Sequence, residues 1–110
     1  MTPSETNINR RVAEACGIKF STDSFGSAVL IENNCNRIFS PMSVDADTVL
    51  AAEKFGLFMN RRNCHMTGLL LPGGRVGWAV WEGGEMISSG TFREAICKAI
   101  LKLSDESTSR

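Results

Sequence analysis

The sequence lacks a charge excess and lacks a long hydrophobic run. Twelve basic and twelve acidic side chains cancel, so the composition favours neither a broad phosphate-binding surface nor an acidic imitation of nucleic acid. No stretch approaches the roughly 18 to 20 apolar residues that a membrane helix needs, and the segment Met1–Arg11 is polar. We therefore expect no membrane contact, no export and a cytoplasmic location.

Metal-binding and catalytic motifs are also missing. No C-x-x-C pair occurs among the four cysteines, which are Cys16, Cys35, Cys64 and Cys97, and scattered thiols stay reduced in an intracellular protein. The only histidine, His65, follows Cys64, but neighbours in a strand point to opposite faces, which argues against a nucleophile–base pair. Nucleotide-binding glycine loops and the common hydrolase motifs are absent. We expect no catalytic residue, no metal site and no cofactor.

The residues that are present are typical of one folded domain. Hydrophobic residues make up 43% and charged residues 22% of 110 positions, far from the composition of disordered chains. This length suffices for one hydrophobic core without metals or disulfides. We expect a single domain over residues 1–110, with a polar, frayed tail from about residue 104.

Periodicity and helix-end signals predict three helices. Their expected ranges are 8–16, 44–55 and 91 to about 103. Ser43 is placed to cap the second helix, and Thr91 and Glu94 have the spacing of a capping box at the start of the third. The third helix is amphipathic, with an apolar stripe of Ala95, Ile96, Ala99, Ile100 and Leu103.

Short aliphatic and β-branched runs between turn residues predict the strands. The expected strands are 28–31, 37–40, 66–71, 76–81 and 86–90. Residues 57–59 look extended, and residues 61–65 form a polar break. Gly-Gly turns join the last three strands as antiparallel hairpins. Because strand 76–81 is apolar on both faces, helices should cover both sides of the sheet. The prediction is an α+β protein, a three-layer α-β-α sandwich with a mainly antiparallel sheet and about three helices.

Arginine pairs and loop-edge aromatics are the candidate partner-binding residues. The paired arginines are Arg10, Arg11, Arg61 and Arg62, and guanidinium groups hold phosphates or acidic partners well. Phe58 flanks a polar loop and Trp81 ends a strand beside a turn, and such aromatics are enriched at protein interfaces. Two alternatives stay open, because the arginines could be ordinary solvated surface and the aromatics could be packed in the core.

Three stretches occur in a familiar order along the chain. They are Ile8–Ala15, then Phe39-Ser40-Pro41 before a helix rich in Ala and Asp, and last the amphipathic segment 91–103. In this order they resemble the small phage and prophage proteins of the ABA-sandwich, NinX-like family. Two features depart from the family: the tryptophan often found near Val49 is missing, and the loop 61–65 has no counterpart. The resemblance implies a fold and a phage context, and it transfers no catalytic residue.

The resemblance and the absent motifs lead to three hypotheses. The first is a non-enzymatic phage accessory protein, an anti-defence, anti-CRISPR-like inhibitor that binds a host defence protein or complex in the bacterial cytoplasm. The second is a sponge for a signalling nucleotide, with an arginine pair and Trp81 or Phe58 holding the base; a small phage regulatory binding protein is a related alternative. The third is an enzyme centred on Cys64 and His65. A homodimer is compatible with the first two.

Overall fold

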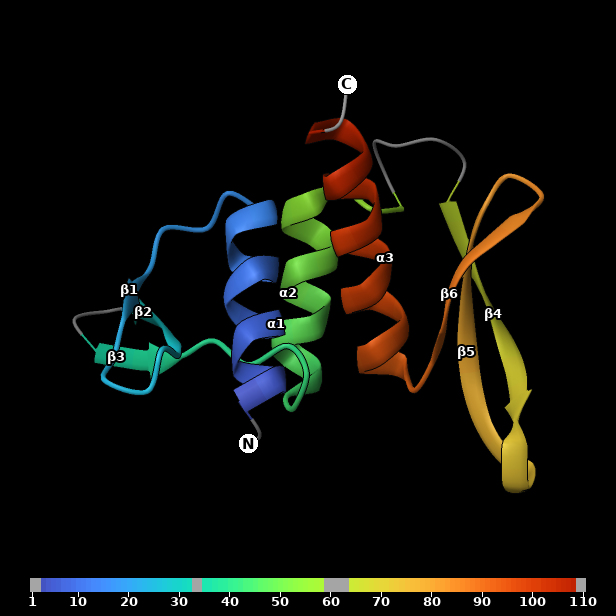
Figure 1. Cartoon of the computed structure of the whole chain (residues 1–110), viewed down its shortest axis with the longest axis horizontal. Helices are drawn as coiled ribbons and strands as arrows, with labels where there is room; N and C mark the ends of the chain where they lie inside the picture. Colours follow the sequence, from blue (N-terminus) through green and yellow to red (C-terminus); the bar gives the residue numbers. More distant parts are fainter. Residues whose placement is uncertain (1–2, 33–34, 59–63, 109–110) are drawn as a thin grey trace.

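The computed structural model describes residues 3–32, 35–58 and 64–108, and three helices lie between two sheets (Figure 1). The helices are α1 (Pro3–Ala15), α2 (Asp45–Phe55) and α3 (Phe92–Thr108). One sheet contains β1 (Ser21–Thr22), β2 (Ala28–Glu32) and β3 (Cys35–Ile38). The other contains β4 (Cys64–Leu71), β5 (Arg75–Glu82) and β6 (Glu85–Gly90), with a short 3₁₀ turn, η1 (Pro72–Gly74), joining β4 to β5.

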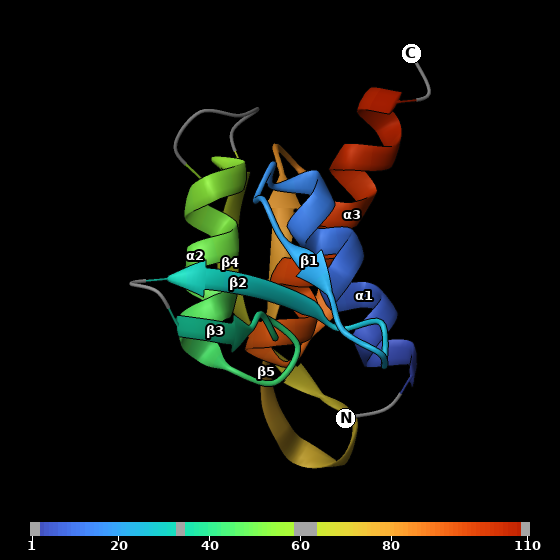
Figure 2. The same ribbon diagram turned by 90° about the vertical axis from the view of Figure 1, so that its left-hand side faces the viewer.

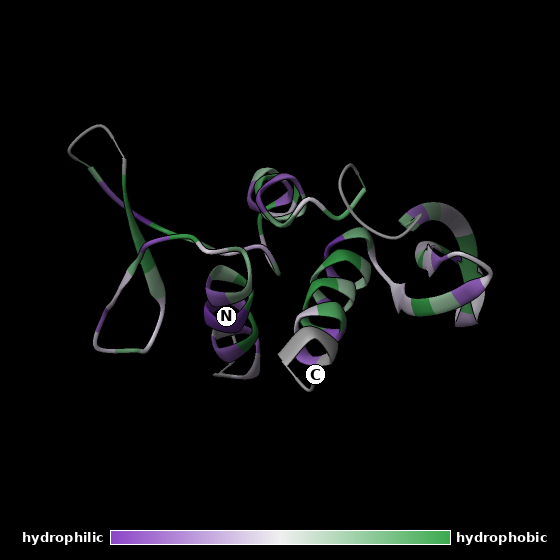
Figure 3. Ribbon diagram, turned by 90° about the horizontal axis from the view of Figure 1, so that it is seen from above, coloured by the Kyte–Doolittle hydropathy of each residue, from purple (hydrophilic) through white to green (hydrophobic). Residues whose placement is uncertain are grey.

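The predicted α+β class is confirmed, with three helices and antiparallel pairing in both sheets. The order of the layers, however, is sheet, helices, sheet, as the view along the helices shows (Figure 3). The strands pair with their neighbours in the chain, and α2 separates β3 from β4. Short hairpin loops cost little closure entropy, so each run of three strands forms its own sheet. The predicted layering, helices on both faces of one sheet, is not confirmed.

The core lies where the helices meet the two sheets. The sheet β1–β2–β3 lies across α1 and α2 (Figure 2), while α3 contacts β5 and β6 on the other side. The whole apolar stripe predicted for the third helix is buried. The largest fully buried apolar side chains of the core are Val12, Phe39, Leu57, Val80, Ile96, Ile100 and Leu103.

Several element ends differ from the prediction. Helix α1 begins at Pro3, since the fixed φ of proline suits a first turn and its missing N–H has no partner there anyway. Helix α3 continues through Thr108, so the segment from 104 to 108 is helical. Leu57 and Phe58 form a turn after α2 instead of the expected extended segment, and Met59 lies outside the described residues. Strand β4 begins at Cys64, inside the expected polar break.

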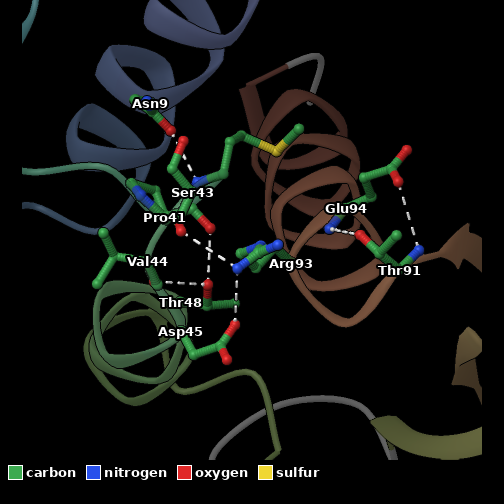
Figure 4. Close-up of polar contacts among 10 residues, drawn as sticks. Asn9, Pro41, Ser43, Val44, Asp45, Thr48, Thr91, Arg93 and Glu94 are labelled. Atoms are coloured by element: carbon green, nitrogen blue, oxygen red, sulfur yellow. Dashed lines mark hydrogen bonds and ion pairs between the residues drawn. The ribbon is translucent and has the colours of Figure 1, made fainter. Parts of the chain in front are cut away.

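The predicted C-terminal end of α2 is confirmed, whereas the predicted N-terminal cap is not. The N-cap is Val44, and no side chain caps this end, so the expected Ser43 cap is wrong. The Ser43 carbonyl instead accepts a 3.1 Å hydrogen bond from Arg93 (Figure 4). The C-terminal end is as expected: Gly56 adopts φ 72°, and its N–H bonds back to the last turn.

The capping box predicted for α3 is confirmed. The N–H of Glu94 donates to the Thr91 hydroxyl at 3.2 Å, and the N–H of Thr91 donates to Glu94 Oε1 at 3.5 Å. Figure 4 places this pair at the start of α3. The reciprocal bonds satisfy two backbone donors that a helix start leaves open.

Buried polar side chains hold the segment between β3 and α2. Asp47 accepts hydrogen bonds from the Arg37 guanidinium at 2.6 Å and from the Ser40 N–H at 2.9 Å. Asn9 of α1 accepts from the Met42 N–H at 2.9 Å and donates to the Ser40 hydroxyl at 3.3 Å. The Phe39-Ser40-Pro41 segment is thus anchored to α1 and α2, which gives it a structural role.

Candidate protein-binding surface

An apolar hollow of about 190 Å³ lies between α2, α3 and β4, and we call it the groove. Its lining consists of Val49, Ala52, Glu53, Phe58, Met66, Phe92 and Ile96. Among these described residues Glu53 is charged and the others are apolar. The groove therefore offers contacts for hydrocarbon and a single carboxylate at its border.

Sequence spacing explains why these side chains converge. Val49 and Glu53 are four residues apart on α2, and Phe92 and Ile96 are four apart on α3, so each pair shares a helix face. Met66 of β4 completes the lining between these two faces. Val49 and Phe58 keep 44% and 40% of their surface exposed. The groove is therefore open to solvent along its α2 side.

The apolar surface continues from the groove along the β4–β5 hairpin. The ring of Phe92 meets Trp78 edge to face, with centroids 6.5 Å apart. Next to Trp78, Leu70 and Val76 oppose each other in the register and are 73% and 81% exposed. We call Leu70, Val76 and Trp78 the hairpin patch, and Figure 1 shows this hairpin extending past the start of α3. Contiguous exposed apolar surface on a small protein is typical of an interaction site.

Trp81 does not belong to this surface. It lies opposite His65 in the β4–β5 register, and the two rings stack with centroids 6.2 Å apart. Its indole N–H donates to the Thr67 hydroxyl at 2.8 Å. By the two-residue strand period these residues face away from Val80, which is packed in the core. The structure therefore places Phe58 and Trp81, both predicted as binding residues, on different surfaces.

The predicted arginines are separate from both aromatics in the part of the chain that is described. Arg10 donates to Asn7 at 2.8 Å, and Arg11 pairs with Asp105 at 3.4 Å. Both lie on α1, which contacts α2, α3 and β2. Figure 1 shows α1 on the side of the helical layer that faces away from β4, β5 and β6. Arg61 and Arg62 lie outside the described residues.

Burial governs the protonation of two of the four cysteines. Burial raises the pKa of Cys16 to about 12, and burial together with the nearby Cys16 raises that of Cys97 to about 12. Cys64 is buried, whereas His65 is exposed at the next position of β4 and stacks on Trp81. None of the four cysteines, all within the described ranges, forms a disulfide.

Two further hollows lie on the opposite side of the molecule and share Lys19 and Ile31. One, of about 340 Å³, is lined by Ile18, Lys19, Leu30, Ile31, Leu50 and Lys54. The other, also about 340 Å³, adds Phe20, Ser21 and Val29. Two lysines border this region, so its charge is opposite to that of the groove.

Comparisons with protein-family models, with curated proteins and with solved structures find no match to this chain. The resemblance to the NinX-like family therefore stays a prediction. Within residues 3–32, 35–58 and 64–108, no helix is long and apolar enough to cross a membrane. The same residues contain no group of three or more histidine, cysteine or acidic side chains arranged to hold a metal ion.

Sequence reasoning found Phe58 and missed the rest of the apolar surface. Val49 and Phe92 are ordinary apolar positions of helices in the sequence, whereas in the structure Val49 is 44% exposed and Phe92 is partly buried. The sequence did contain a pattern that indicates the hairpin patch. Leu70 and Val76 flank the Pro-Gly-Gly turn, and apolar residues at the tip of a hairpin are far from any helix that could bury them.

Proposed function

We propose that this protein is a non-enzymatic phage accessory protein that inhibits a host defence system by binding one of its proteins. The groove and the hairpin patch form the binding surface. One observation carries the proposal: Phe92 lines the groove together with Val49, and its ring also contacts Trp78 of the hairpin patch, so the two apolar surfaces meet at Phe92. The phage setting is supported by the resemblance of the sequence.

The shape of the groove favours a protein partner over a small molecule. Its volume of about 190 Å³ is below the roughly 300 to 1,000 Å³ of typical small-molecule pockets. It suits one or two anchoring side chains, while the rest of the partner covers the hairpin patch. The partner should therefore present an exposed apolar anchor.

The charge of the groove limits the kind of partner segment that it can bind. Glu53 lines the groove, and among the residues that the structure describes no lysine or arginine does so. A phosphate group placed here would be repelled by the carboxylate, whereas an arginine or lysine beside the apolar anchor would be attracted. We infer a partner segment in which an apolar anchor stands next to a basic residue.

Phage challenge tests the proposal. Bacteria carrying single defence systems would express either the wild type or one of two variants, Val76→Glu and Ile31→Glu. Both positions are exposed aliphatic strand residues, but Ile31 lies in the other sheet, so it is a matched control. We expect the wild type and Ile31→Glu to protect the phage and Val76→Glu to lose protection.

A binding assay with the purified effector of the affected defence system then tests the contact directly. Binding to wild type and Ile31→Glu, with loss of binding to Val76→Glu and Val49→Glu, would support the groove and hairpin patch. Equal protection by Val76→Glu and wild type, or the absence of protection against every system tried, would contradict the proposal.

A nucleotide sponge is the second candidate, and Lys19 and Lys54 favour it at a different place from the predicted arginines. Two ammonium groups beside an apolar hollow, with Phe20 nearby, suit a phosphate and a base. Cyclic dinucleotides should raise the melting temperature of the wild type but not of the Lys19→Ala, Lys54→Ala double variant. Unchanged melting curves for the wild type would remove this candidate.

A further inference from the structure

Strand β4 is an edge strand without the usual protection against pairing. Its one neighbour among the described strands is β5. It has eight residues, Cys64–Leu71, with no proline and no aspartate, glutamate, lysine or arginine. Its register with β5 runs without a bulge from end to end. Such an edge presents a row of backbone donors and acceptors to another strand.

The other three edge strands of the described sheets are each protected in a way that natural proteins commonly use. Strand β1 has two residues, and β3 carries Arg37. Strand β6 begins with Glu85, and its pairing with β5 contains a register shift at Val80/Trp81. Short length, charge and bulges all oppose edge-to-edge pairing. The contrast sets β4 apart.

We propose that β4 pairs antiparallel with β4 of a second copy of this chain, around a two-fold axis at Gly68. The two three-stranded sheets then form one continuous six-stranded sheet. In this register Leu70 lies opposite Met66 of the second copy on the face toward the helices. On the other face, Thr67 lies opposite Leu69 of the second copy and His65 opposite Leu71 of the second copy.

Charge and side-chain complementarity favour a second copy over a different protein. Because β4 carries no acidic or basic side chain other than His65, two copies meet without like charges directly opposite one another. A different partner selected by charge would find no matching charge on this strand. Leu70, 73% exposed in the single chain, gains an apolar neighbour in Met66 of the second copy. The edge is thus complementary to itself, as a two-fold interface requires.

The dimer goes beyond the proposed function and does not depend on it. Met66 lines the groove, so Leu70 of the second copy extends the apolar wall of the groove across the two-fold axis. Two grooves then lie on the same side of one sheet. Dimerisation is measured on the purified protein alone, so its failure is distinct from a failure to bind a host protein.

The substitution Gly68→Lys tests the register at its centre. A Cβ at Gly68 meets no atom within 4 Å, so the single chain accommodates the side chain, whereas two lysines face each other in the dimer. Gly84→Lys is the matched control, because a Cβ at Gly84 also meets nothing within 4 Å and lies in the turn between β5 and β6. Sedimentation equilibrium should show a wild-type dimer, an unchanged Gly84→Lys dimer and a dissociation constant about fivefold higher or more for Gly68→Lys.

A charge-swap mixture sharpens the test. Equal amounts of Gly68→Lys and Gly68→Glu should form a mixed dimer, since opposite charges then meet at the axis. A wild type that stays monomeric at every concentration at which it is soluble would overturn the proposal. A dimer that Gly68→Lys leaves unchanged would do the same, because it would use another interface.

Hydrogen exchange on the unsubstituted chain provides a measurement that does not rely on variants. Pairing protects backbone amides of β4 that point away from β5, so their exchange should slow as the protein concentration rises. Amides of β1, at an edge of the other sheet, serve as the internal reference. Protection of β4 that is independent of concentration would contradict the pairing.

Discussion

Asp47 of α2 is 2% exposed and lies 2.6 Å from the Arg37 guanidinium of β3, across the boundary between the helical layer and the first sheet. Its other oxygen accepts the Ser40 N–H at 2.9 Å. Replacing Asp47 with alanine leaves that N–H without this acceptor and the arginine without this charge. We predict a loss of about 2 to 3 kcal/mol in the free energy of unfolding, measured by urea denaturation.

Asp45 provides the control for this prediction. It is also an aspartate in the first turn of α2, and it pairs with Arg93 at 3.2 Å, but its side chain is 73% exposed. An exposed pair of this kind contributes about 0 to 1 kcal/mol. If Asp45→Ala destabilised the protein as much as Asp47→Ala, helix-start electrostatics would explain both, and the buried contact would not be needed.

Two glycines in adjacent strands should respond to alanine with opposite signs. A Cβ on Gly77 would lie 2.5 Å from Leu71 Cδ1 and 2.7 Å from the Gly90 carbonyl oxygen, whereas a Cβ on Gly68 meets nothing within 4 Å. We predict that Gly77→Ala lowers the free energy of unfolding by about 1 to 3 kcal/mol. Gly68→Ala should be neutral or stabilising by up to about 1 kcal/mol. Thermal melts of the two variants check this, and a shared sign would contradict the packing around Gly77.

The capping box of α3 should produce a pH dependence in the acidic range. Burial alone would raise the pKa of Glu94, but hydrogen bonds from Thr91 and the charge of Lys98 outweigh it and lower that pKa. A lowered pKa means that the ionised Glu94 stabilises the fold above the pKa of the unfolded carboxyl. This contribution is lost as the pH falls through the lower, folded value.

The comparison of wild type with Glu94→Gln measures this effect. The difference in their free energies of unfolding should be largest near neutral pH and should disappear in acid, where the wild-type carboxyl is protonated. A difference that stays constant across the pH series would mean that Glu94 acts only through packing or through a neutral hydrogen bond.

The thiols should differ strongly in reactivity. Cys35 is exposed, whereas burial raises the pKa of Cys16 and of Cys97 to about 12. Because the thiolate is the reactive form, a maleimide or disulfide reagent should modify Cys35 first and the other two only after unfolding. Mass spectrometry of the labelled protein checks the order, and Cys35→Ser should remove the fast phase.

The same two thiols predict a loss of stability in alkali. The unfolded chain ionises them at the ordinary thiol pKa, while the folded chain holds their protons until about pH 12. The unfolded state therefore binds fewer protons in this window, and the free energy of unfolding falls as the pH rises. Cys97→Ala should reduce this slope, and an equal slope in the variant would contradict a buried, protonated Cys97.

Local patterns predicted the elements whose signals come from neighbours in the chain. The stripe from Ala95 to Leu103, the Thr91–Glu94 box and the Gly56 helix end all depend on residues within one or two turns. The hairpins around Pro72 and Gly83 were predictable for the same reason. The Ser43 cap was a wrong prediction because the helix begins one residue later than expected, which makes Val44 the N-cap.

The candidate site was less accessible to sequence reasoning. Phe58 was identified as a loop-edge aromatic, but Val49 and Trp78 resembled core residues until the structure showed them exposed. The sequence made Arg11 a candidate binding residue, but in the structure it forms an ion pair with Asp105. Exposure and partnership at such positions depend on residues that are distant in the chain.

The sequence by itself determined the α+β class, the three helices, the chain-order hairpins and the missing catalytic motifs, because periodicity, turn residues and spacing are local properties. Only the tertiary structure decided that the sheet is divided in two and that helices lie between the halves. It also decided that one apolar groove with Glu53 at its border stays open beside an unprotected β4 edge. The packing of all elements together decides which apolar faces are buried, and no single segment of the sequence contains that information.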